Sequence, residues 1–277
     1  MTEQNYENLE RQLFYTGFSE VSKEELKNQM ATGKEEFQLL HQKEYGTDKV
    51  SAHLNIKLSE KGNYYFHSYD LSLKKQGEEH PVSRTFKINY GNTYTLKEAY
   101  NMLDGRSVNK DFLPRQKKDE NGVFQPLEKD ENGRLKTYNA WAYLDMTEKD
   151  KDGDFLVKKK FNYDLEEALS KHPIKEMGFD QSRSELIESL KKGNRQMVTT
   201  MRDGREEKMY FEAAPRSGSV NIYDSNMKKE LLSLAKRPEQ SVSEEKKLSK
   251  KEGIDNQDSE GERTDHKVRK SRAKRVG

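Results

Sequence analysis

The residues with the clearest chemical potential are six cations near the end of the chain. They occupy nine positions with no acid between them: Lys267, Arg269, Lys270, Arg272, Lys274 and Arg275. Lysine and arginine neutralise phosphates and release their counterions, so this run predicts salt-sensitive binding to DNA or RNA. A charged tail can also serve only to keep a chain in solution, and the sequence leaves that alternative open.

An acidic segment at residues 150–154 resembles part of a calcium loop. Its sequence, Asp-Lys-Asp-Gly-Asp, alternates acids around a glycine. A calcium loop with its glycine at the sixth place needs a bidentate glutamate at the twelfth. Counting from Gly153, that place is Lys159, which is a cation. The segment therefore predicts a hairpin turn and no metal site.

Histidines and nucleophiles give no catalytic pattern. His41, His53 and His67 fall in the first part of the chain, but no His-x-x-x-His pair occurs, so we expect structural histidines. The chain has no cysteine, which excludes disulfides, thiolate metal sites and cysteine nucleophiles. It also lacks the usual phosphate-loop, dinucleotide and serine-elbow motifs. We therefore predict no catalytic residues and no cofactor, with an enzyme of unrecognised chemistry as an open alternative.

Aromatic side chains on predicted strands form a second candidate for nucleic-acid contact. They are Tyr64, Tyr65, Phe66, Tyr69, Tyr138, Trp141 and Tyr143. On an exposed sheet face such rings stack unpaired bases, at about 1–3 kcal/mol each. The alternative is the core of a thin sheet, which the slightly acidic body favours. The alternation over residues 65–73 predicts Tyr65, His67 and Tyr69 on one face.

Three stretches of the chain repeat one unit that would position these residues. Each begins with a helix cap, at Ser22, Thr95 and Ser182, and each helix is closed 10 or 11 residues later by a glycine. The closing glycines are Gly33, Gly105 and Gly193. Strands follow, and we expect them to end at the Tyr-Asp pairs 69–70, 163–164 and 223–224. A module copied within one chain favours a binding scaffold over a catalytic site.

These patterns predict an α+β fold of three tandem modules, each a short helix plus an antiparallel sheet, with a disordered C-terminal tail. Residues 50–58 give the clearest strand, with every second residue apolar. Within the second module, Lys118–Gly122 recurs as Lys129–Gly133, and its Asn-Gly pairs are hairpin-turn signals. The predicted boundaries are 1–92, 93–176 with a polar insertion at 114–136, 177–235, and a charged tail at 236–277.

Charge is unevenly placed along the chain. Residues 236–277 hold 13 of the 51 Lys and Arg residues and 9 of the 49 Asp and Glu residues, a net charge of +4, so residues 1–235 carry −2. The tail has no aromatic residue and few apolar ones, which predicts disorder. The N-terminus has no signal-peptide pattern, and no apolar run approaches about 20 residues. We therefore expect a cytoplasmic protein without membrane contact.

Five segments carry a resemblance to a known family. They begin with Tyr-Thr-Leu-Lys-Glu-Ala-Tyr and continue through residues 94–110, 138–141, 163–169, 173–176 and 221–228. Together they resemble uncharacterised proteins of Bacteroidota conjugative transposons and other mobile elements. Similar helix-glycine-strand repeats are appended to topoisomerase-like proteins. The resemblance implies a setting in horizontal DNA transfer and brings no catalytic residues with it.

The sequence thus predicts a non-catalytic accessory or binding protein of a mobile genetic element that touches nucleic acid through its basic tail. The alternative is a protein–protein interaction module that holds DNA-processing proteins of the same element, such as a relaxase or topoisomerase, without contacting DNA. Salt-dependent retention on DNA would separate the two.

Overall fold

The computed structural model of the 277-residue chain describes residues 2–89, 91–202 and 204–230. These residues belong to one compact unit. The predicted tail at 236–277, with its six cations, lies outside the described residues.

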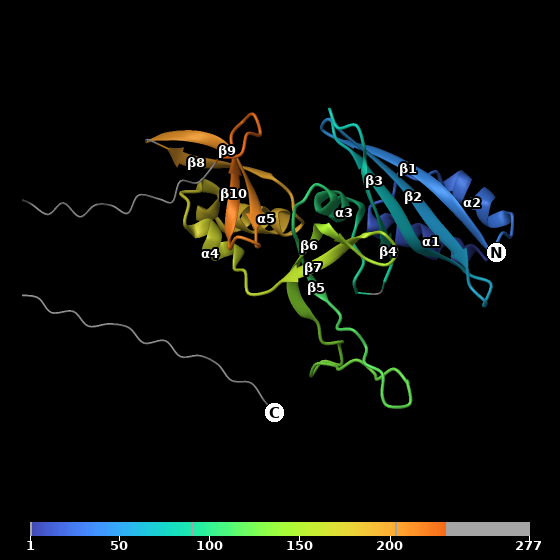
Figure 1. Ribbon diagram of the computed structural model, residues 1–277. Helices are drawn as coiled ribbons and strands as arrows, with labels where there is room; N and C mark the ends of the chain where they lie inside the picture. Colours follow the sequence, from blue (N-terminus) through green and yellow to red (C-terminus); the bar gives the residue numbers. More distant parts are fainter. Residues whose placement is uncertain (1, 90, 203, 231–277) are drawn as a thin grey trace, which may run out of the picture. The chain divides into compact units, whose positions relative to one another are not determined.

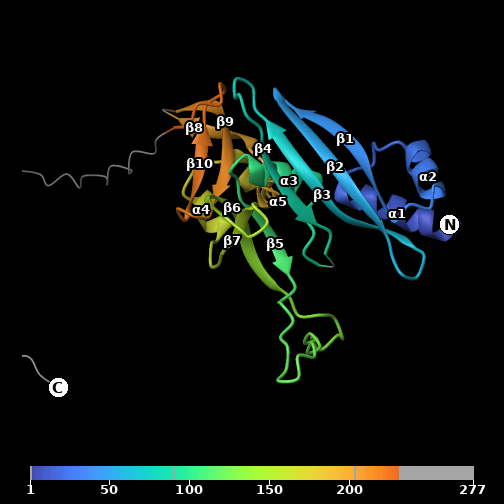
Figure 2. The same cartoon turned by 45° about the vertical axis from the view of Figure 1, so that its right-hand side comes forward.

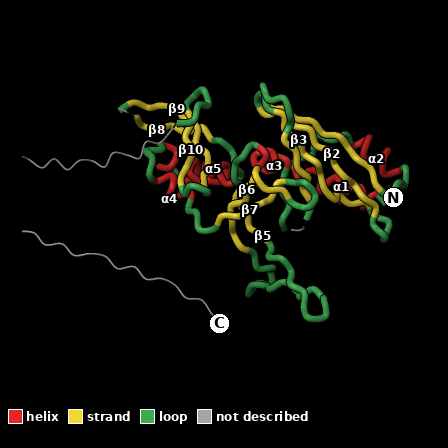
Figure 3. The backbone as a smooth tube through the Cα atoms, viewed as in Figure 1, coloured by secondary structure: helices red, strands yellow, loops and turns green. Residues whose placement is uncertain are grey.

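The described residues fold into five α-helices, one short 3₁₀ helix and ten strands (Figure 1 and Figure 3). The strands form three antiparallel sheets of four, three and three strands, which confirms the predicted α+β class. None of the described helices is long and apolar enough to cross a bilayer.

The first sheet has the order β1-β2-β3-β4 and is covered on one face by α1 and α2. These elements are α1 (Glu3–Thr16), α2 (Lys23–Ala31), β1 (Glu36–Tyr45), β2 (Asp48–Leu58), β3 (Tyr64–Lys74) and β4 (Val82–Lys87). The predicted alternation in β2 is confirmed, because Val50, Ala52, Leu54 and Ile56 are buried while the residues between them are at least partly exposed. Burying one face of each strand against two amphipathic helices is the expected way to form such a core.

The second sheet, in the order β5-β6-β7, is shared between two hydrophobic cores. It follows α3 (Leu96–Leu103) and consists of β5 (Val108–Phe112), β6 (Tyr138–Lys149) and β7 (Phe155–Lys160). Ala140 and Ala142 of β6 belong to the core under the first sheet, whereas Trp141 between them belongs to the second core. Because successive strand residues point to opposite faces, one strand serves both cores.

The third sheet has the order β10-β9-β8 and packs with α4 and α5 around the second core. The elements are α4 (Leu165–Ser170), the 3₁₀ helix η1 (Lys175–Gly178), α5 (Asp180–Lys191), β8 (Gln196–Arg202), β9 (Arg205–Ala214) and β10 (Ser219–Tyr223).

Each of the three sheets contains a three-stranded meander that follows a helix and its closing glycine. Gly33, Gly105 and Gly193 have φ of 68°, 82° and 79°, so all three take the left-handed conformation that favours glycine.

Two of the three predicted helix caps are present. The Ser22 hydroxyl accepts the N–H of Glu25, and Thr95 forms a complete capping box with Glu98. The prediction at Ser182 is wrong, because α5 begins two residues earlier at Asp180. The Ser182 hydroxyl donates to the carbonyl oxygens of two preceding residues, so it lies inside the first turn and does not cap it.

The predicted strand ends at the Tyr-Asp pairs are mostly wrong. Tyr69-Asp70 lies in the middle of β3, and β7 ends at Lys160, before Tyr163-Asp164. The Asp164 carboxylate instead accepts the N–H of Glu167 and caps α4. Only Tyr223 ends a strand, β10.

A β-bulge in β3 overturns the predicted face of Tyr65 and His67. Asn55 pairs with Ser68, but the next residue, Ile56, pairs with Phe66, so His67 is an extra residue. An inserted residue reverses the alternation beyond it. As a result Tyr65 is 39% exposed, while Tyr69 is completely buried.

Candidate binding site

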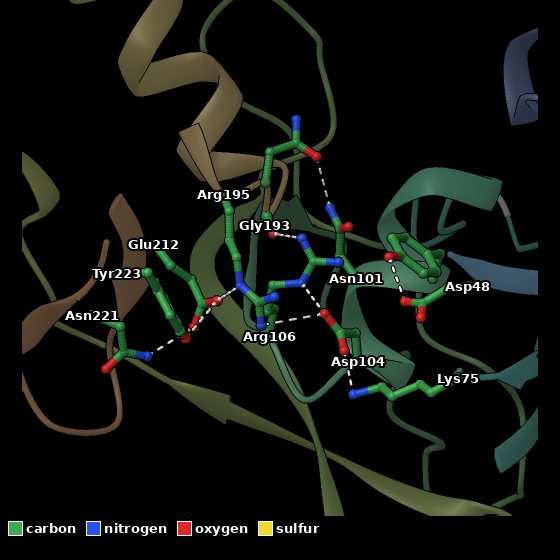
Figure 4. Close-up of polar contacts among 12 residues, drawn as sticks. Asp48, Lys75, Asn101, Asp104, Arg106, Gly193, Arg195, Glu212, Asn221 and Tyr223 are labelled. Carbon is green, nitrogen blue, oxygen red and sulfur yellow. Dashed lines mark hydrogen bonds and ion pairs between the residues drawn. The ribbon is translucent and has the colours of Figure 1, made fainter. Parts of the chain in front are cut away.

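One buried carboxylate, that of Asp104, joins residues next to all three sheets (Figure 4). Asp104 ends α3, and its side chain is 5% exposed. It forms ion pairs with Lys75, which follows β3, with Arg106, which precedes β5, and with Arg195, which precedes β8. Its Oδ2 lies 2.9 Å from Arg106 Nε and 3.4 Å from an Arg195 terminal nitrogen. Three cations compensate for burying this carboxylate.

A second buried carboxylate, Glu212 on β9, extends the network into the third sheet. Its Oε2 accepts Arg195 Nε at 2.8 Å, and its Oε1 accepts the Asn221 amide at 2.8 Å. The Tyr223 hydroxyl donates to Oε2 at 3.2 Å. Burial, reinforced by the Glu212 carboxylate, raises the pKa of Tyr223, so the phenol remains a neutral donor.

The closing glycine of α5 is the point where this helix docks against the segment after α3. Arg106 donates to the Gly193 carbonyl at 3.0 Å, and the Asn101 amide donates to the Lys192 carbonyl at 2.6 Å. A Cβ at Gly193 would lie 2.8 Å from the Ser107 carbonyl oxygen, so no side chain fits. These contacts use the unsatisfied carbonyls at a helix C-terminus, which attract cations and donors.

The contact between the segment of α3 with β5–β7 and the segment of α5 with β8–β10 is reciprocal. Arg106, just after the glycine of one helix, reaches the end of α5, and Arg195, just after the glycine of the other, reaches Asp104 at the end of α3. The sequence carried a signal for it that we did not use. A cation follows each closing glycine within two residues, at Lys34, Arg106 and Arg195.

Docking of α5 beside β5 forms a cleft of about 500 Å³. The sheet contributes Asn109, Asn139, Trp141 and Lys160 to its lining, and α5 contributes Ile187 and Lys191. The segment that leads into α4 contributes residues 162–166, which include the acids Asp164 and Glu166. The Asn109 and Asn139 amides bond to each other in both directions, at 2.7 and 3.0 Å. The lining of this cleft is mainly polar, with Trp141 and Ile187 among its apolar residues.

The charged side chains that line the cleft are of both signs, two lysines and two acids. Lys160 and Lys191 are exposed, and no carboxylate of the described residues is within ion-pair distance of either. Asn162 has a φ of 57°, an uncommon value for a residue with a side chain, and it turns the chain from β7 toward α4 at this cleft. The two lysines and the two acids balance in formal charge, so the lining suits a polar ligand and shows no preference for an anion.

The residues singled out from the sequence are placed as follows. Four of the seven strand aromatics, Tyr64, Phe66, Tyr69 and Trp141, are buried, and among the seven only Tyr65 is exposed, at 39%. The core interpretation therefore holds for most of them. The six tail cations lie outside the described residues.

The acidic segment at 150–154 forms the predicted turn. Asp150 Oδ1 accepts the N–H groups of Asp152 and Asp154 at 2.9 and 3.1 Å, so it is committed to the backbone. His41 is buried against Phe18 with its Nε2 unpaired, whereas His53 is exposed. Within residues 2–89, 91–202 and 204–230, no group of three or more His, Asp or Glu side chains is arranged to hold a metal ion.

Comparison with known proteins gives no relative from which a role could be transferred. No family model matches the chain, and no curated protein or solved structure matches it.

Proposed function

We propose that the protein is a non-catalytic binding or adaptor protein of a mobile genetic element and that it contacts nucleic acid through its tail. The observation that carries the binding role is the reciprocal docking of two helix-glycine-meander units through Asp104, Arg106 and Arg195. Buried charged groups here join copies of one scaffold. The genetic setting rests on the resemblance of residues 94–110 and the other segments quoted for it.

Charge supports nucleic-acid contact by the tail. The last eleven residues carry +6 with no acid among them, while residues 1–235 carry −2. If all six cations engage phosphates of duplex DNA, the logarithm of the affinity falls with that of the salt concentration with a slope of about −5.

The test is an anisotropy titration of labelled DNA with the full chain and with a chain ending at Ala235. The shorter chain retains both cores, and we expect it to lose most of the affinity and the salt slope. Equal binding with an equal slope would contradict the role of the tail.

Lys160 and Lys191, the two cations of the cleft, are a second candidate for phosphate contact, and charge reversal separates them from the tail. Lys160→Glu with Lys191→Glu would weaken residual binding by the shorter chain if the cleft takes part. Lys34→Glu with Lys61→Glu is the matched control, because both residues are exposed and outside the cleft. Equal losses would indicate a general charge effect and no cleft contribution.

The protein–protein alternative is favoured by the arm formed by residues 114–136. Figure 2 shows this segment projecting from β5 and β6, and almost all of its side chains are exposed. Val123 and Phe124 are 61% and 59% exposed although both are apolar. Exposed aromatic anchors on a preformed loop are typical of interaction sites.

A pull-down from the native host tests this alternative. Phe124→Ser would remove a partner that Phe14→Ser retains, since the two phenylalanines are equally exposed on different elements. A partner kept by both variants would exclude Phe124 as its anchor.

A further inference from the structure

The strand β1 lies at one side of the first sheet (Figure 1), and its backbone shows which groups point away from the sheet. The Glu35 carbonyl accepts the Leu58 N–H at 2.7 Å, so these two residues form a hydrogen-bonded pair next to β1 and β2. In an antiparallel ladder, bonded and non-bonded pairs alternate. Every second residue after Glu35 therefore bonds to β2, and the residues between them direct their backbone groups outward. The outward residues are Glu36, Gln38, Leu40, Gln42 and Glu44.

The outer edge of β1 is open to another strand. Within the part of the chain that the structure describes, no hydrogen bond reaches the backbone N–H or C=O of the five outward residues. All five are exposed, and the central one, Leu40, is 52% exposed although it is apolar. The edge also contains no proline or bulge that would prevent pairing. A long, regular strand edge of this kind is a template for a further strand.

The other outermost strands are occupied or short. The Thr85 N–H of β4 donates to an aspartate, and the Thr199 N–H of β8 donates to a glutamate. The Ile222 carbonyl of β10 accepts a backbone N–H from the segment that follows. The two remaining outermost strands, β5 and β7, have five and six residues, against ten in β1. Of these strands, β1 therefore offers the longest edge for pairing.

We propose that β1 pairs with β1 of a second copy of this chain, antiparallel across a twofold axis at Leu40. The length of the strand selects this register. With Leu40 opposite Leu40 of the second copy, every outward residue faces an outward residue, and all five N–H and all five C=O groups of each strand are bonded. A slip of one residue would set outward groups against inward ones. A slip of two would leave Glu36 or Glu44 beyond the end of the other strand. A twofold pair is also closed, so neither copy keeps an open β1 edge.

The side chains of the outward residues fit this register in the middle and oppose it at the ends. Leu40 would meet its own copy and cover apolar surface, and Gln38 would meet Gln42, whose amide can both donate and accept. Glu36 would meet Glu44, and like charges directly opposite each other destabilise a strand pair. Lys57 lies 3.3 Å from Glu36 and reduces this repulsion. We therefore expect a weak dimer that depends on concentration.

The test is analytical ultracentrifugation of the full chain from micromolar to near-millimolar concentration, where the mean mass should rise from one chain to two. Leu40→Lys sets two cations against each other at the axis and should raise the dissociation constant about tenfold. Its matched control is His53→Lys, because His53 is exposed beside Leu40 but belongs to β2, away from the edge. The control should dimerise like the wild type.

A second variant should strengthen the dimer, which a loss of folding could not do. Glu44→Lys turns both like-charge contacts into contacts between opposite charges and should lower the dissociation constant about tenfold. Glu60→Lys makes the same change of charge at an exposed residue in the turn after β2 and should leave the constant unchanged. A chain that stays monomeric at every concentration would overturn the proposal. A dimer unaffected by Leu40→Lys and Glu44→Lys would overturn it too, since its interface would lie elsewhere.

Amide hydrogen exchange, followed by NMR at low and high protein concentration, locates the contact on β1. The N–H groups of Gln38, Leu40 and Gln42 become bonded only in the dimer, so their exchange should slow as the concentration rises. The N–H groups of Leu39 and His41 are bonded to β2 in the monomer and should change little. Slowing that is equal for outward and inward residues, or absent from both, would contradict pairing through this edge.

Discussion

At the residue scale, the three closing glycines share a conformation but differ in what surrounds them. All three have positive φ, which a side chain tolerates poorly. A Cβ at Gly33 or Gly105 would meet no atom within 4 Å, whereas at Gly193 it would overlap the Ser107 carbonyl and approach Asn101. Gly193 is therefore needed for two reasons, its backbone angle and its close contact with the segment after α3.

Replacing these glycines separates the two reasons. Gly33→Ala should lower the free energy of unfolding by about 1 kcal/mol, the cost of a left-handed side chain. Gly193→Ala should lower it by about 3 kcal/mol, because the docked segment must also move. Urea denaturation of the two variants measures both values. Equal losses would show that the contact at Gly193 adds nothing.

The ion pairs of Asp104 give a second residue-scale prediction. Asp104→Asn leaves the buried Arg106 and the partly exposed Lys75 and Arg195 without their carboxylate, and loss of one partner of a buried pair costs about 3–5 kcal/mol. Glu128→Gln breaks the ion pair between Glu128 and Lys136, both largely exposed, and should leave the urea midpoint unchanged. A small effect at Asp104 would mean that water replaces the carboxylate.

At the element scale, one turn recurs in the chain and explains how the arm at 114–136 is ordered without a core. In each copy an aspartate Oδ1 accepts the N–H groups two and four residues ahead, at Asp119, Asp130, Asp150 and Asp224. The residue three positions after the aspartate has positive φ, and in the first three copies it is glycine. Side-chain bonds to the backbone thus fix the turn locally.

The fourth copy departs from this rule, because Met227 takes the glycine position with a φ of 61°. Its side chain is 46% exposed, so it contributes little burial. Met227→Gly should raise the free energy of unfolding by up to about 1 kcal/mol by relieving the left-handed strain. Thermal and urea unfolding check the sign, and a loss of stability would mean that the Met227 side chain packs favourably.

At the scale of the whole molecule, the three sheets are linked through shared cores. The first core crosses residue 92 into α3, β5 and β6, and Trp141 of β6 belongs to the second. Because the middle sheet serves both cores, unfolding one of them exposes the apolar surface of the other. The repeat seen in the sequence is therefore a repeat of local units and not of independent cores.

Two histidines, the buried His41 and the partly exposed His172, make the stability of the whole chain depend on pH. Burial lowers the pKa of His41 and His172 below their ordinary value of 6.5. As pH falls below 6.5, the unfolded chain takes up protons that the folded chain does not, so the free energy of unfolding decreases. Stability should be highest above pH 6.5 and should fall toward pH 5.

His41→Phe tests the contribution of His41 to this effect. His41 is buried with Nε2 unpaired, and a phenylalanine has a similar size and no proton to bind. The variant should show a shallower loss of stability between pH 7 and 5 in urea titrations at each pH. An unchanged slope would assign the dependence to other groups.

The sequence by itself determined the features that depend on neighbouring residues. The Thr95 capping box, the left-handed glycines, the alternation in β2 and the aspartate turns all rest on bonds or steric limits within about five residues. For this reason the α+β class and most helices and strands could be predicted. Two strands could not: β1, whose polar residues hide its alternation, and the short β5.

Only the tertiary structure decided the rest. The bulge at His67 depends on the register of β3 with β2. The ion pairs of Asp104 with Lys75 and with Arg195 join residues that are 29 and 91 positions apart in the sequence. Their chemistry exists only after the helix ends have docked, because the low exposure that strengthens a charge pair is produced by packing and not by sequence spacing.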